Sequence, residues 1–139
     1  MEILFKYLGE IQYPEVMSFI LLILAFGDTV TSLMWRNKKG LSILSKKLWL
    51  GFAINTLAAS VPYVVSRIPI FNMHDFFVNT ALILWTLIFG VAAGFSLVAN
   101  YKLYSAESYE VLIKIVPQLF KAEIEKKVNK HVKKGEVND

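Results

Sequence analysis

The sequence predicts an all-α integral membrane protein with three transmembrane helices and a C-terminal amphipathic helix in the cytoplasm. Hydrophobic residues make up 55% of the 139 residues, and three long apolar segments contain a single charged residue between them. More than half of the charged residues follow residue 100. The charged share of 19% lies below the roughly 25% that is typical of soluble domains. This composition excludes a disordered chain, a soluble nucleic-acid-binding domain and a small secreted scaffold.

The three apolar segments are long enough to cross a bilayer. They are residues 16–35, 48–66 and 76–100. A helix rises 1.5 Å per residue, so about 20 apolar residues span a hydrocarbon core of about 30 Å. As buried helices of a soluble protein, these segments would leave too little polar surface. The sequence therefore predicts a transmembrane domain over residues 16–104.

The predicted domain has a short segment before it and a basic tail after it. Residues 1–15 carry three glutamates and no basic region ahead of the apolar run, so they do not resemble a cleaved signal peptide. Residues 2–11 have scattered apolar side chains that suit a short interfacial helix, and Pro14 is well placed to begin the first span. We assign residues 1–15 to an extracytoplasmic or interfacial segment and residues 105–139 to the tail.

The distribution of basic residues predicts the orientation. The loop between the first two spans has five basic residues and no acidic one: Arg36, Lys38, Lys39, Lys46 and Lys47. The N-terminal segment is net negative, the second loop is neutral and the tail is net positive. The positive-inside rule then places the N-terminus outside and the C-terminus in the cytoplasm of a bacterial cell. The same five side chains are candidates for contact with lipid headgroups.

The tail has the pattern of an amphipathic helix. Apolar residues recur at three- and four-residue spacing from Leu112 to Val132, with charged residues between them. Pro117 interrupts this pattern and should break or kink the helix, because proline lacks a backbone donor and clashes with the preceding turn.

Asp28 is the only charged residue inside a predicted span. It lies about seven residues, or roughly 10 Å, from the end of the first segment, and a carboxylate at such depth costs about 2.5–3.5 kcal/mol on insertion scales. Asp28 and the nearby Thr31 are therefore candidates for a pore-lining or packing role. The alternative is that Asp28 reaches the interface or forms an ion pair that only fixes topology.

Small residues in the third span form a candidate helix–helix contact. Gly90 and Gly94 are four residues apart, which lets two helix backbones approach closely in lipid, and Ser96 broadens the small face. This face fits a contact between copies of the chain. It fits equally a contact with another span of the same copy.

No motif for bond chemistry is present. The sequence has no GxxxxGK[ST], HExxH or GxSxG motif and no cysteine. We therefore predict a protein that is not an enzyme and that uses no cofactor or metal ion. The expected partners are membrane lipid and further copies of the chain, with no nucleic acid.

Two stretches of the chain resemble the phage lysis and toxin-secretion holins of Gram-positive bacteria and their phages. Residues 28–32 (DTVTS) resemble that family's D-x-x-T-G, with Ser32 in place of the glycine. Residues 96–100 (SLVAN) resemble its S-I-x-E-N, with Ala99 in place of the acidic residue, and a basic amphipathic tail follows. The resemblance covers roughly residues 20–120.

The resemblance implies a protein that accumulates in the cytoplasmic membrane, assembles and opens a lesion that releases a cell-wall hydrolase or a toxin. Composition and spacing support the small size, the spans and the faces suited to association. Two alternatives stay open. One is a non-lytic accessory subunit whose tail docks a cytoplasmic partner, and the other is a channel for ions or small solutes.

Overall fold

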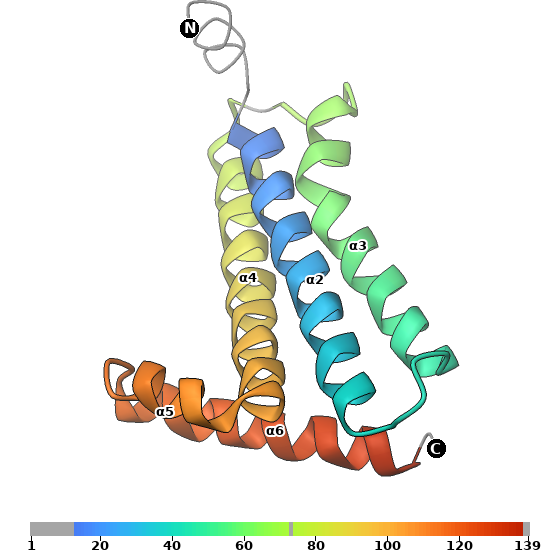
Figure 1. The fold of residues 1–139 in the computed structure, drawn as a ribbon. Coiled ribbons are helices and arrows are strands. Elements are labelled where there is room, and N and C mark those ends of the chain that lie inside the picture. The colour runs from blue at the N-terminus through green and yellow to red at the C-terminus, as the bar shows by residue number, and fades with distance from the viewer. Residues whose placement is uncertain (1–12, 73, 138–139) are drawn as a thin grey trace, which may run out of the picture.

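The computed structural model describes residues 13–72 and 74–137, and every regular element in these ranges is helical (Figure 1). In chain order the helices are α2 (Tyr13–Lys38), α3 (Lys46–Arg67), α4 (Phe76–Tyr104), α5 (Ala106–Ile113) and α6 (Gln118–Val137). The first three are long and apolar enough to cross a membrane. The all-helical class and the three candidate spans are thus confirmed. The interfacial helix expected within residues 2–11 lies outside the described residues.

Helix α2 is the centre of the three-helix bundle. It packs along both α3 and α4, whereas α3 and α4 make few contacts with each other, as Figure 1 shows. Many large apolar side chains point outward instead of into a core, among them Phe19, Leu57 and Ile88, which are 64%, 69% and 64% exposed. Such an apolar exterior suits a lipid surrounding and would be unfavourable in water.

The bounds of the helices follow from local chemistry. Helix α2 ends in a Schellman turn: the Leu41 N–H donates to the Arg36 carbonyl at 2.9 Å and the Gly40 N–H to the Asn37 carbonyl at 3.1 Å. Gly40 has a φ of 70°, which glycine adopts without strain. Helix α4 begins where Asp75 accepts hydrogen bonds from the N–H groups of Phe77 and Val78 at 2.7 and 3.2 Å.

Pro62 lies inside α3, and both neighbouring helices compensate for it. A proline has no N–H, so the Ala58 carbonyl four residues earlier loses its helical donor. The indole N–H of Trp85 in α4 donates to that carbonyl at 2.9 Å. On the other side, the Tyr63 N–H donates to Ser18 Oγ of α2 at 2.9 Å. The proline thus frees the carbonyl that ties α3 to α4, and the residue after it ties α3 to α2.

Replacing Trp85 with phenylalanine should destabilise the bundle by about 1–3 kcal/mol, because a carbonyl in an apolar environment would lose its donor. The measurement is the unfolding of the purified protein in mixed micelles, followed by helical circular dichroism. Trp49→Phe is the matched control, since Trp49 is 45% exposed and its indole bonds to the nearby Ile43 carbonyl. Equal unfolding of the two variants would contradict this role of Trp85.

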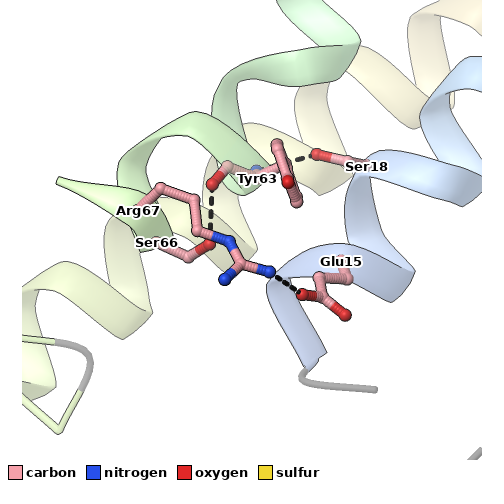
Figure 2. A network of polar contacts seen from close by, with 5 residues as sticks. All are labelled: Glu15, Ser18, Tyr63, Ser66 and Arg67. Carbon is pink, nitrogen blue, oxygen red and sulfur yellow. Dashed lines mark hydrogen bonds and ion pairs between the residues drawn. The ribbon is translucent and has the colours of Figure 1, made fainter. Parts of the chain in front are cut away.

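Polar contacts also tie α2 to α3 at the end of the bundle where α2 begins. Figure 2 shows Arg67 directed at Glu15, and the Arg67 Nη2–Glu15 Oε1 distance is 2.5 Å. The hydroxyl of Ser66 donates to the Tyr63 carbonyl at 2.6 Å, beside the bond between Ser18 and Tyr63 (Figure 2). The acidic residue from the N-terminal segment and the basic residue at the end of α3 therefore neutralise each other.

The tail forms two helices that lie across the opposite end of the bundle (Figure 1). Helix α5 ends at Ile113 and α6 begins at Gln118, so the helix breaks just before Pro117 as the sequence predicts. Ile124 and Val128 of α6 are 2% and 8% exposed and pack with Ala99 and Tyr109. Lys102 of α4 pairs with Glu125 of α6. We call this end, which also holds the α2–α3 loop, the lysine-rich end.

Candidate functional site

Three side chains form a hydrogen-bonded group between α2 and α4 near the lysine-rich end. Asn100 Nδ2 donates to Asp28 Oδ1 at 2.6 Å and to the Asp28 carbonyl at 3.2 Å. Asn100 Oδ1 accepts from Trp35 Nε1 at 2.8 Å. Asn100 and Trp35 are 1% and 2% exposed. We call these residues the Asp28–Asn100–Trp35 cluster. It gives the one charged residue of the predicted spans a specific partner on another helix.

Ser96 extends this cluster to the tail. It is buried on α4, one helical turn before Asn100. Its Oγ is 2.9 Å from Nε2 of His131 in α6. Burial and the positive charges of Lys134, Lys127 and Lys130 lower the pKa of His131 to about 4. His131 is therefore neutral at pH 7, which allows it to lie half-buried against the bundle.

A polar cavity of about 320 Å³ lies beside the cluster. Its walls come from α2, α3, α4 and α6. Asp28, Ser32, Asn55, Ser96 and Asn100 supply polar side chains from the three long helices. The end formed by α3 and α6 is lined with lysines. The cavity exists because α3 and α4 pack closely against α2 but not against each other.

Asp28 and Thr31, the two residues of the predicted pore or packing site, have different surroundings in the structure. Asp28 lines the cavity, whereas Thr31 is not among the residues that line it. Thr31 Oγ1 donates to the carbonyls of Gly27 and Asp28 at 2.8 and 3.1 Å, within its own helix. Ser96, which the sequence suggested as part of a helix–helix contact, lines the same cavity as Asp28 and lies against His131 of α6.

Gly90 and Gly94 have different surroundings. A Cβ added at Gly90 would lie 3.5 Å from Leu21 Cδ2, so Gly90 lies against α2 of the same copy. A Cβ added at Gly94 would meet nothing within 4 Å. Gly90 therefore allows α4 to pack against α2 within one copy, whereas the space beside Gly94 is open. A contact between copies through Gly94 stays a prediction.

The five basic residues that the sequence placed in the first loop lie at the end of α2, in the α2–α3 loop and at the start of α3, and they divide into separate groups. Arg36 is 4% exposed and donates to the Ser42 carbonyl at 3.2 Å, so it holds the loop. Lys38 donates to the Tyr104 carbonyl at 2.7 Å, and Lys39 lies over the Trp35 ring at 5.7 Å. Lys46 is exposed and Lys47 lines the cavity. Headgroup contact through these residues stays a prediction.

Sequence reasoning did not assign roles to Trp35, Asn100 and His131 in this site. Asn100 carried a signal, because it is an amide at the end of an apolar run and one turn after Ser96. Trp35 and His131 carried none, since their partners lie 65 and 35 residues away in the sequence. Within residues 13–72 and 74–137, no three His, Cys, Asp or Glu side chains are grouped to hold a metal ion.

Comparisons of the chain with protein-family models, with curated proteins and with solved structures found no match. The three helices long and apolar enough to cross a membrane are consistent with a multi-pass membrane protein, and the cluster and the cavity give it a polar interior site.

Proposed function

We propose that this chain is a holin-like protein that self-associates in the bacterial cytoplasmic membrane and permeabilises it, which releases a cell-wall hydrolase or a toxin. The polar cavity is the observation that carries the proposal. A carboxyl, two amides and three hydroxyls line it within three helices whose outer faces are apolar. Such polar groups are costly against lipid, so assembly that turns them toward water is favourable.

The position of the two family-like stretches supports the same proposal. Asp28, which opens the first stretch, accepts a hydrogen bond from Asn100, which ends the second, and Ser96, which begins the second, lines the same cavity. Ser96 and Asn100 follow Asp28 by 68 and 72 positions in the sequence, yet all three belong to one site. A chain that only had to span the membrane would need no such arrangement.

We infer that the lysine-rich end lies in the cytoplasm and that α2 begins outside. The α2–α3 loop and α6 lie at one end of the bundle and the α3–α4 loop at the other (Figure 1). The basic residues gather at the first end, as the positive-inside rule requires of a cytoplasmic side. In this orientation α6 is a cytoplasmic amphipathic helix whose apolar side rests on the end of α4.

Exposed apolar residues in the tail favour the second candidate, a non-lytic accessory subunit. Val111, Ile115 and Leu119 lie around the break between α5 and α6 and are 69%, 80% and 76% exposed. An apolar patch of this kind outside the spans fits a cytoplasmic protein partner.

Controlled expression in a bacterium separates these functions. The cells carry a potential-sensitive dye and a cytoplasmic enzyme reporter. We expect sudden loss of the membrane potential together with release of the reporter. Loss of potential alone would indicate a channel for ions or small solutes, and growth with an intact potential would favour the accessory subunit.

Gly94→Leu should delay or abolish this permeabilisation, because a bulky side chain in the open space at Gly94 would keep two copies apart. Ala81→Leu is the matched control, since Ala81 lies on the same helix and is exposed. Crosslinking of membranes should show fewer oligomers for Gly94→Leu only. Oligomers and leakage equal to those of Ala81→Leu would exclude Gly94 from the contact.

A further inference from the structure

We propose that the lysine-rich end binds an anionic phospholipid, with the phosphate between Lys47, Lys130 and Lys134 and one acyl chain between α3 and α4. The inference rests on the membrane position of α2–α4 and goes beyond permeabilisation. The lipid would occupy the cavity of a single, unassembled copy.

The charge of the cavity is strongly unbalanced. Five cationic side chains line it against one carboxylate; the cations are Arg36, Lys47, Lys127, Lys130 and Lys134. The ion pairs in the described part of the chain, Arg67–Glu15 and Lys102–Glu125, use none of these four lysines. Asp28, the one acid, already bonds to Asn100. The cavity therefore lacks an anion that would balance its lysines.

The lysines come from two helices that converge on one place. Lys130 and Lys134 lie one turn apart on α6, and Lys47 is in the first turn of α3. All three also line a second hollow that adjoins the cavity. Burial and the repulsion of Lys130 and Lys127 lower the pKa of Lys134. A bound phosphate would relieve this repulsion.

The start of α3 and an arginine donor at the same place also favour an anion. Ser45 precedes α3 but makes no side-chain hydrogen bond to its first turn, which also contains no acidic residue. The N–H groups of Leu48 and Trp49 donate to the Ser45 carbonyl, and the positive end of the helix dipole favours an anion there. Arg36, which lines the cavity, has a buried Nε with no partner among the described residues.

The apolar wall of the cavity distinguishes a lipid from a free phosphate. Gly51 and Ile54 of α3 face Phe89, Ala92 and Ala93 of α4 across it. From Lys47 to Ile54 the helix rises about 10 Å, and from Asn100 to Phe89 about 16 Å. One leaflet of a hydrocarbon core about 30 Å thick has a similar depth. An acyl chain would fill this wall, whereas a free phosphate would not touch it.

The first test removes the lysines. The protein is purified in neutral detergent and titrated with phosphatidylglycerol, and bound lipid is counted by native mass spectrometry. The triple variant Lys47→Gln, Lys130→Gln, Lys134→Gln should bind on the order of 100-fold more weakly, since each basic residue contributes about 1 kcal/mol at an anionic headgroup. The control is Lys46→Gln, Lys114→Gln, Lys121→Gln, which removes the same charge from lysines outside the cavity.

The second test fills the apolar wall. Gly51→Leu places a large side chain where an added Cβ meets nothing within 4 Å, so the helix can accept it while the acyl chain loses its space. We expect about tenfold weaker binding of phosphatidylglycerol. Ala53→Leu, an exposed position that does not line the cavity, should bind as the wild type does.

Each alternative outcome overturns the proposal. Equal loss in the two lysine triples would mean diffuse attraction by a basic surface. A site for a free phosphate group would be indicated if Gly51→Leu binds phosphatidylglycerol unchanged and glycerol phosphate competes as effectively as the lipid does. Circular dichroism and thermal unfolding check that each variant folds. Because binding is measured in detergent on the purified protein, its result is independent of whether the chain permeabilises cells.

Discussion

Replacing Asn100 with leucine should lower the free energy of unfolding by about 2–6 kcal/mol. The amide of Asn100 joins Asp28 Oδ1 to Trp35 Nε1, and the side chains of Asn100 and Trp35 are buried. Leucine has a similar size but leaves both partners without a hydrogen bond, and each buried polar group so left costs about 1–3 kcal/mol. We therefore expect α2 and α4 to separate first at the lysine-rich end.

The measurement is unfolding in mixed micelles with increasing denaturing detergent. Asn55→Leu is the matched control, because Asn55 is exposed on α3 and takes no part in the Asp28–Asn100–Trp35 cluster. Adding Trp35→Phe to Asn100→Leu removes one of the two orphaned groups and should cost less than the sum of the single changes. If Asn100→Leu and Asn55→Leu unfold at the same concentration of denaturing detergent, the cluster does not hold α2 and α4 together.

Acidification should release α6 from the bundle. His131 has a pKa of about 4 where it docks and an ordinary value near 6.5 when free. The free helix therefore binds more protons between these values. Docking is fully stable above pH 6.5 and weakens progressively as the pH falls toward 4, by up to about 3 kcal/mol.

Amide hydrogen exchange of residues 118–134, corrected for the intrinsic effect of pH, measures this release. Protection should fall between pH 6.5 and 4 in the wild type. His131→Gln keeps a polar partner for Ser96 but does not titrate, so its protection should change much less. The lysines that face His131 stay charged throughout, and Asp28 is present in both proteins. The same pH profile in both would assign the change to Asp28 and not to His131.

The three spans could be predicted because a membrane imposes a simple length rule on apolar sequence. The predicted segment 16–35 lies within the helix Tyr13–Lys38, and the predicted segment 76–100 lies within the helix Phe76–Tyr104. The helices are longer because backbone hydrogen bonding continues past the apolar residues, until the turn at Gly40 and the break at Ser105 end it. Pro117 lies in the break between α5 and α6, because a proline interrupts a helix locally in any chain.

The site could be predicted only in part, because its geometry depends on contacts between helices. Asp28 was recognisable alone, since a carboxylate in an apolar run is unusual. Its partner Asn100 lies 72 residues away, and nothing near Asp28 indicates which helix it faces. The same holds for Gly90 and Gly94, whose spacing predicts a close approach but not its partner. The cavity follows from the poor contact of α3 with α4, which no local pattern encodes.

The bond between Asp28 and Asn100 has a consequence for the synthesis of the chain. At about 5–20 residues per second, a ribosome makes Asn100 roughly 4 to 14 s after Asp28. During this interval α2 has entered the membrane while the amide that will hold its carboxyl does not yet exist. The apolar stretch ahead of Asp28 must therefore offset the insertion cost alone. Integration of α2 becomes secure only when the last span is complete, so a truncated chain that lacks α4 should be removed by quality control.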